Sequence, residues 1–226
     1  MKKFLMILLG IIVIAACKKD EPPVVEPPVI EPPVEPVVYP EYGNLKVGNY
    51  WIYQHYHIDT NGIETPLDKF DTCYIENDTV IGEHTYFKMI RPRISIPKFG
   101  TYYWREFEGV IYDRNGKVHF SAEDFTTIFE TRYSIRTNGD EVDTLYVVTS
   151  MMVDKDKNII TPAGNFLTRT YQAKYELADW FSIGMLKTRF SNTRYTRDIG
   201  IVSETLEIYA SDPTYKERRL VSWGTK

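Results

Sequence analysis

The stretch that decides the fold is FLTRTYQAKY, residues 166–175. Its side chains alternate between two sets, and a repeat of two residues is the repeat of a β-strand, whereas a helix repeats every 3.6 residues. The pattern therefore predicts a strand with one buried and one wet face. One set comprises Leu167, Tyr171, Ala173 and Tyr175, and the polar set comprises Thr168, Thr170, Gln172 and Lys174.

Similar runs recur from about Tyr42 to the end of the chain, bounded by glycine, asparagine and aspartate. Asn-Gly pairs begin at Asn61, Asn115 and Asn138, and this dipeptide is a strong hairpin signal because both residues tolerate positive φ. One short helical turn is expected at 177–181. The expected strands are 50–58, 70–81, 85–90, 102–107, 110–113, 118–120, 125–131, 142–153, 166–175, 185–196, 201–209 and 219–223.

No helix-length crossover separates these strands, so the sequence predicts an all-β fold. The expected architecture is a curved antiparallel meander that forms a half-barrel or open barrel, with a closed barrel or sandwich as alternatives. It occupies a single domain, residues 42–226. A chain of this length buries about 70% of its extended-state surface, so it needs no disulfide or metal for stability.

The N-terminus has the pattern of a signal peptide, residues 1–16: two lysines, an apolar run over 4–14, and two alanines. The run is too short for a transmembrane helix, which needs about 20 apolar residues. The segment IAAC, residues 14–17, resembles the lipobox of bacterial lipoproteins, and this resemblance implies that Cys17 becomes the acylated (palmitate-type) first residue of the mature chain. The alternative is an ordinary secretory signal that contains a cysteine.

Residues 17–41 are expected to be the lipidated cysteine and a linker. KKDE, residues 18–21, resembles a surface-export tag of Gram-negative lipoproteins, which implies the outer face of the outer membrane; the periplasmic face is the alternative. EPPVVEPPVIEPPVEPVVYP, residues 21–40, favours polyproline II because proline restricts both itself and the residue before it. At ~3.1 Å per residue, this tether reaches on the order of 60 Å.

The charge of the chain argues against nucleic acid as a partner. Of the 27 basic residues, the signal peptide contains Lys2 and Lys3, so the mature chain has 25 basic and 31 acidic residues and a formal charge of −6. Phosphate binding needs a clustered positive surface. The densest basic stretch, residues 187–197, is interleaved with uncharged side chains as the face of a strand would be.

Several residue types that could carry chemistry lack the rest of a site. Cys73 has no intrachain partner and is expected to be a small core residue. His55 and His57 would share a strand face, but a metal needs further ligands, and His119 is expected to face outward. DKDKN, residues 154–158, opens like a calcium loop but lacks its glycine and glutamate, so a charged hairpin tip is expected. No metal, cofactor or catalytic residue is predicted.

Three segments together resemble an uncharacterised family of bacterial lipoproteins. They are LKVGNYWIY (residues 45–53), TPAGNF (161–166) and DIGIV (198–202), which look like the family's LKVGNxWxY, TPAGxF and xxGIV motifs. The resemblance covers most of residues 42–223. It implies a curved antiparallel sheet similar to the half-barrels of lipoprotein carriers, and it implies no activity and no site residues.

Aromatic residues are the remaining functional clue, with 17 tyrosines and four tryptophans. Tyr102 and Trp104 lie in a run of three aromatic residues, so at least one is expected to meet solvent or a ligand. We expect a non-enzymatic envelope lipoprotein that binds an apolar ligand or an envelope protein through the concave face of its sheet. A glycan-binding or adhesive module that uses exposed tyrosines is the alternative, and an enzyme with a site of scattered residues is a third.

Overall fold

The computed structural model describes residues 37–93, 98–182, 186–205 and 214–226. The predicted signal peptide, Cys17 and nearly all of the linker lie outside the described residues. Val38–Lys226 form one compact unit, and everything below concerns this unit.

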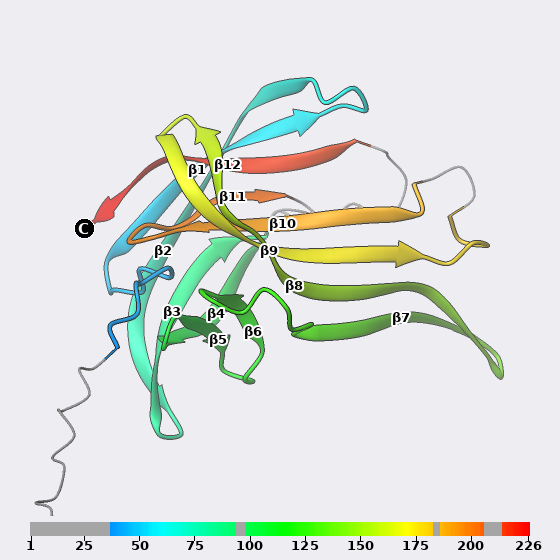
Figure 1. The fold of residues 1–226 in the computed structure, drawn as a ribbon, viewed down its shortest axis with the longest axis horizontal. Helices are drawn as coiled ribbons and strands as arrows, with labels where there is room; N and C mark the ends of the chain where they lie inside the picture. Colours follow the sequence, from blue (N-terminus) through cyan, green and yellow to red (C-terminus); the bar gives the residue numbers. More distant parts are fainter. Residues whose placement is uncertain (1–36, 94–97, 183–185, 206–213) are drawn as a thin grey trace, which may run out of the picture. The chain divides into compact units, whose positions relative to one another are not determined.

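Twelve antiparallel strands form a single curved sheet (Figure 1), which confirms the all-β meander. The part of the chain that the structure describes contains no helix, and hence none long and apolar enough to cross a membrane. The strands are β1 (Asn49–Ile58), β2 (Glu64–Ile81), β3 (His84–Pro92), β4 (Phe99–Phe107), β5 (Val110–Asp113), β6 (Val118–Ser121), β7 (Glu130–Asn138), β8 (Glu141–Thr161), β9 (Gly164–Leu177), β10 (Thr188–Thr196), β11 (Gly200–Thr205) and β12 (Tyr215–Thr225).

The strand order is β6-β5-β4-β3-β2-β1-β12-β11-β10-β9-β8-β7. Each half of the chain is thus a meander of sequential hairpins, and the halves join where β1 pairs with β12. The two edges, β6 and β7, are neighbours in sequence but are not hydrogen-bonded to each other. The sheet curls so far that Phe120 of β6 packs against Tyr195 of β10, with 4.7 Å between ring centroids.

The three Asn-Gly pairs all lie at hairpin turns, as predicted, although Asn138 is itself the last residue of β7. Only the glycines have positive φ, so these turns are not the two-residue type in which both central residues do. Instead, Asp59 accepts hydrogen bonds from the amides of Asn61 and Ile63 at 2.8 Å each. Asp113 binds Asn115 and Lys117 in the same way, at 2.8 and 3.0 Å. The repeated D-x-N-G pattern builds the same five-residue loop twice.

Three local expectations were wrong. The strand expected at 125–131 is mostly a connection, and the edge strand β7 begins only at Glu130. Residues 154–158 are not a hairpin tip: β8 continues through them with an irregularity, where Asp154 and Asp156 take positive φ. The segment 177–181 ends β9 and forms a hydrogen-bonded turn, in which the amide of Phe181 donates to Ala178 O at 3.0 Å.

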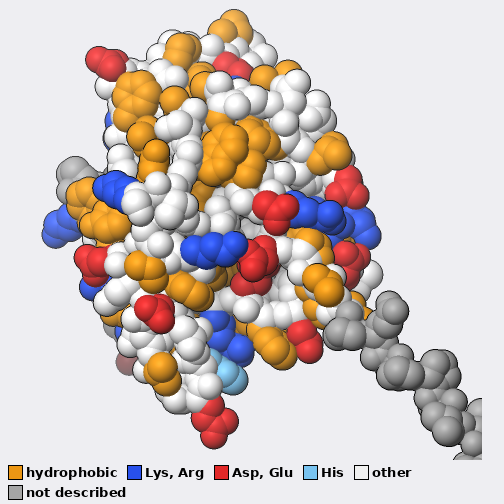
Figure 2. All heavy atoms as spheres, turned by 90° about the vertical axis from the view of Figure 1, so that its left-hand side faces the viewer, with side chains coloured by type: hydrophobic (Ala, Val, Ile, Leu, Met, Phe, Trp, Pro, Cys, Tyr) orange, Lys and Arg blue, Asp and Glu red, His pale blue; other side chains and the backbone are white. Residues whose placement is uncertain are grey.

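The true tip of the β8–β9 hairpin lies beyond that irregularity, at Pro162 and Ala163. It reaches β12, because the Ala163 amide donates to Leu220 O at 3.0 Å. Phe166 meets Trp223 edge to face, at 5.9 Å between centroids. The C-terminal end of β12 lies on the left in Figure 1, and Figure 2 shows that side of the molecule. It carries several groups of apolar side chains among charges of both signs. The motif around Pro162 therefore serves a tertiary contact within the second half of the chain, between the β8–β9 hairpin and β12.

Candidate functional site

Part of the concave face of the sheet, where a ligand was expected, is occupied by the chain itself. Residues 41–45 run across it before β1 begins. The amides of Tyr42 and Gly43 each donate to a carboxylate oxygen of Glu106 at 2.7 Å. On the other side, the Asp198 amide donates to Glu41 O at 2.9 Å. This segment thereby joins β4 to the β10–β11 turn across the interior.

The side chain of Tyr42, in the same segment, packs between the edge strand β6 and β9. The ring of Tyr42 packs on Phe120 at 4.6 Å and lies 5.2 Å below the guanidinium of Arg169. Arg169 also donates to Ala122 O and, at 3.0 Å, to Glu123, both in the connection that leaves β6. Arg169 therefore fastens the β6 edge to β9 through side-chain contacts.

A buried cluster of charges spans five strands at the centre of the sheet. Glu204 Oε2 lies 2.6 Å from Arg218 Nη2 and 2.5 Å from Arg91 Nη2. Asp71 Oδ2 lies 3.1 Å from Arg218 Nη1 and 2.7 Å from His55 Nε2. Two guanidinium groups and two carboxylates therefore balance one another, which is the arrangement that makes buried charge tolerable.

The electrostatics of this cluster keep both carboxylates ionised. Burial opposes the charge of Glu204, but Arg218 and Arg91 outweigh that effect and lower its pKa. Burial likewise opposes the charge of Asp71, and its pKa is lowered by the hydrogen bond and charge of His55 and by Arg218. Because each charge in the cluster is paired with an opposite charge, the cluster has a structural role. Neither of its carboxylates holds a proton that it could donate as a general acid.

Beside the cluster lies an internal cavity of about 10 Å³, which is the space of a single water molecule. This cavity is too small for a lipid or any other apolar ligand. The lining residues are Gly43, Trp51, Tyr53, Cys73, Met89, Arg91, Trp104, Tyr195 and Ile201.

Trp104 and Tyr102, the predicted ligand contacts, both point into this interior. Trp104 is 4% exposed and cannot offer its ring to a glycan. Tyr102 is partly buried and packs against the core. The guanidinium of Arg91 lies 5.5 Å from both rings, so their π-faces are engaged within the protein.

The other singled-out side chains have structural roles. Cys73 is buried and free, as expected of a core residue, and burial raises the pKa of its thiol. His119 does not face outward as expected: it is half-buried against Trp104 at 5.1 Å, and burial lowers its pKa. His55 binds Asp71, whereas His57 has no part in the cluster. Among the described residues, no three histidine, cysteine or acidic side chains gather as metal ligands.

An open groove of about 380 Å³ lies on the surface beside residues 39–41, near the start of the described chain. Its walls mix apolar and acidic side chains, with Lys46 paired to Glu41 at 3.2 Å. Burial raises the pKa of Glu106 at the groove floor, although two backbone amides oppose this shift. The groove is lined by Tyr39, Pro40, Glu41, Leu45, Lys46, Phe87, Glu106, Glu108 and Gly109.

The outer face of β4 and β5 carries two half-buried tyrosines, Tyr103 and Tyr112. Tyr103 points away from the core, since it neighbours inward-facing Trp104, and the guanidinium of Arg114 lies 5.4 Å from its ring. Tyr112 is stacked in the same way by Arg105, at 4.9 Å. These rings have one face engaged by arginine and are only partly exposed.

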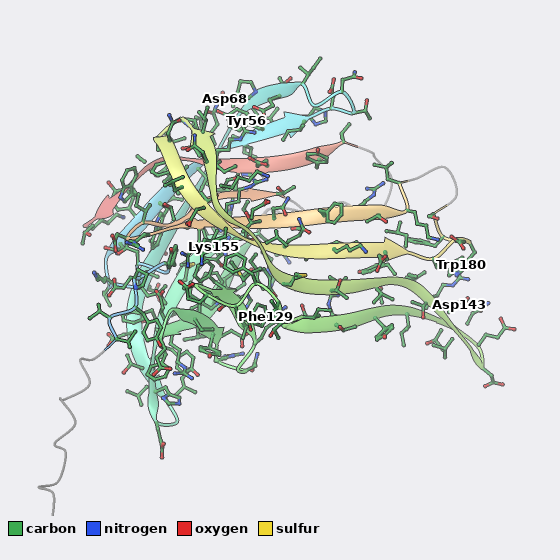
Figure 3. All side chains as sticks on the ribbon, viewed as in Figure 1. Tyr56, Asp68, Phe129, Asp143, Lys155 and Trp180 are labelled. Atoms are coloured by element: carbon green, nitrogen blue, oxygen red, sulfur yellow. The ribbon has the colours of Figure 1, made fainter. Side chains whose placement is uncertain are left out.

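The free edge strand β7 is the most exposed regular element. Among the described residues no strand pairs with its outer side. Tyr133 and Ile135 are 63% and 57% exposed. At the end of the β7–β8 hairpin, Trp180 and Asp143 lie together (Figure 3), joined by Arg136, which pairs with Asp143 at 3.0 Å and lies 4.8 Å from the Trp180 ring.

Comparison with known proteins gives structural neighbours alone. No family model matches the chain, and no curated protein matches it. A "putative lipoprotein" from Parabacteroides distasonis has a TM-score of 0.48 at 10% identity, over 83% of this chain and 100% of its own. A "putative exported protein with YmcC-like fold" from Bacteroides fragilis has a TM-score of 0.46 at 10% identity, over 82% and 100%. The chain is similar to these two bacterial proteins, and neither description names an activity.

Proposed function

We propose that this chain is a non-enzymatic, lipid-anchored protein of the bacterial outer membrane, displayed at the cell surface, that binds a partner through its outer surface. The observation that carries the proposal is the order IAAC at 14–17, proline-rich tether, folded unit. The geometry at the end of the tether supports it. Because Glu106 and Asp198 hold the segment at 41–43, the tether ends at a fixed point on the sheet.

We place the proposed binding surface on the outside of the sheet, because residues 41–45 cover the concave face beside β4 and the cavity left there, of about 10 Å³, is too small for a lipid. The chain combines a predicted lipid anchor, a predicted proline-rich spacer and a folded unit whose buried charges are paired. This organisation is suited to presenting the surface of the folded unit to another molecule.

The anchor is tested by expressing the full chain and its Cys17→Ser variant in a Gram-negative host. The native chain is expected in the membrane fraction with acyl groups on its N-terminal cysteine by intact mass, and the variant is expected to be soluble and unacylated. A native protein without acyl groups would overturn the proposal. Protease treatment of intact cells tests surface display: degradation supports it, and protection until the outer membrane is broken places the protein on the periplasmic face.

Glycan binding remains a second candidate because Tyr103 presents part of its ring outward beside Arg114. Aromatic rings stack on sugars, and arginine adds hydrogen-bond donors. On a glycan array, Tyr103→Ala should abolish any signal that Tyr215→Ala, a change of another exposed tyrosine, leaves unchanged. Equal binding by native protein and Tyr103→Ala would exclude this face.

A further inference from the structure

The outer edge of β7 is a row of backbone donors and acceptors without a neighbouring strand among the described residues. Such an edge is a template for another strand unless charges, prolines or bulges protect it. The nine residues of β7 include no proline. The irregularity opposite Ser134 belongs to the partner strand: β7 advances one residue there while β8 advances two, past Leu145. The free edge of β7 is therefore regular.

Apolar side chains accompany this edge. Tyr133 and Ile135 flank Ser134 and are both more than half exposed. Ile128 before the strand and Val142 in its hairpin partner are 55% and 62% exposed. A regular edge with exposed apolar side chains gains both hydrogen bonds and apolar contacts when a strand pairs with it.

The sequence of β7 indicates what that strand is. Residues 131–137 read TRYSIRT, which has the same chemistry in both directions around Ser134: threonine at both ends, arginine next, and an apolar residue on each side of the serine. A two-fold axis places identical strands antiparallel, so residue i meets its mirror position in the other copy. Tyr133 would then meet Ile135 of the second copy, and Ser134 would meet Ser134.

The arginines are the feature that could oppose this pairing, since the same register sets Arg132 against Arg136 of the other copy. Each guanidinium is already engaged within its own chain. Arg136 pairs with Asp143 and lies over Trp180. Arg132 hydrogen-bonds Tyr146. These contacts reduce the repulsion between the two side chains.

We propose that two copies of this chain pair antiparallel through β7, around a two-fold axis at Ser134, to form a continuous sheet across the dimer. The inference goes beyond partner binding as proposed above and does not depend on the lipid anchor. Anchoring to one membrane would strengthen the pairing, because it raises the effective concentration of the second copy.

The test uses the Cys17→Ser mature chain, in which Cys73 is buried, with one added cysteine. Side chains directly opposite in an antiparallel pair have Cβ atoms about 4.5–5.5 Å apart, close enough for a disulfide after slight adjustment. Ser134→Cys is therefore expected to give a disulfide-linked dimer under mild oxidation. Val80→Cys, at a 70% exposed site in the β2–β3 hairpin, is the matched control and should give no disulfide-linked dimer.

Sedimentation equilibrium provides a second test, which measures dimerisation without a crosslink. The parent should show a concentration-dependent monomer–dimer equilibrium, and Ile135→Lys should weaken it at least about tenfold, because each substitution enters a two-fold interface twice. Val80→Lys should leave it unchanged, and circular dichroism checks that both variants fold. A strictly monomeric parent, a dimer that Ile135→Lys does not weaken, or equal crosslinking of both cysteine variants would overturn the proposal. So would a monomer whose β7 instead binds an extended peptide of another protein.

Discussion

Arg218 and Glu204 stand opposite each other on β12 and β11, with guanidinium and carboxylate 2.6 Å apart and the arginine side chain wholly buried. Arg218→Met should lower the free energy of unfolding by about 3–5 kcal/mol, because it leaves the buried Asp71 with His55 alone and Glu204 with Arg91 alone. Urea denaturation measures the change. Lys174→Met, which breaks an exposed pair with Glu176, should cost less than about 1 kcal/mol. Equal effects would contradict the role of burial.

The same cluster predicts a loss of stability in acid. The pKa values of Asp71 and Glu204 are lowered in the folded protein, so between those values and the ordinary 3.8 and 4.5 the unfolded chain binds more protons. Their contribution is complete above about pH 5 and falls as pH drops through the folded pKa values. Glu106, whose pKa is raised, works in the opposite direction. The free energy of unfolding, measured in urea from pH 3 to 7, should fall less with decreasing pH in Asp71→Asn than in the native protein. An equal fall in both proteins would contradict a contribution from Asp71.

Gly200 has positive φ, and a Cβ there would lie 3.2 Å from Gly43 O and 3.5 Å from Trp51 Nε1. Gly200→Ala should therefore combine backbone strain with a clash against the N-terminal segment, and we expect a loss of about 2–4 kcal/mol. Gly139→Ala isolates the backbone part, since its φ is also positive but nothing lies within 4 Å. That change should cost about 1 kcal/mol. Thermal unfolding of both variants distinguishes the two contributions.

Arg169 holds the β6 edge near β9, so Arg169→Met should release the connection at 122–129. We expect cleavage of this connection by a nonspecific protease under native conditions to become faster, because local opening requires fewer contacts to break. Lys155→Met is the control, since Lys155 contacts the same Glu123 at 3.1 Å but is exposed. Comparable cleavage rates in the two variants would show that Tyr42 and the core hold this edge without Arg169.

Alternation predicted the strands that have one wet face, although it assigned the wrong faces at the start of β9, where Leu167 is 64% exposed and Thr168 and Thr170 are fully buried. It failed where both faces are alike. Val110–Asp113 has the predicted bounds, because its neighbours Glu108–Gly109 and Asn115–Gly116 mark clear turns. β7 was missed because nearly all of its side chains are exposed, which leaves no apolar period to detect. Residues 154–156 have the composition of a turn, yet the strand resumes beyond them because Lys157 pairs with Thr168.

The charge cluster was beyond sequence reasoning for a different reason. It depends on the registers that bring His55 opposite Arg218 and Arg218 opposite Glu204, and the first of these pairings joins strands from opposite ends of the folded unit. One local signal existed. Asp71 occupies the inward register of Cys73 and Ile75, where an acid requires a buried partner. An acidic residue at a position where buried apolar side chains recur predicts that a buried cation or hydrogen-bond donor pairs with it. The sequence does not identify which residue that is.

The pairing of β1 with β12 has a consequence for how the protein matures. Either meander can fold by local steps, each hairpin forming on its neighbour as the polypeptide emerges. Their junction, in contrast, pairs Asn49 with Thr225, so Trp51, Tyr53 and His55 lack their neighbours on β12 until the last strand has been synthesised. Because this pairing joins segments far apart in sequence, we expect the centre of the sheet to assemble last, after the local hairpins of the two meanders.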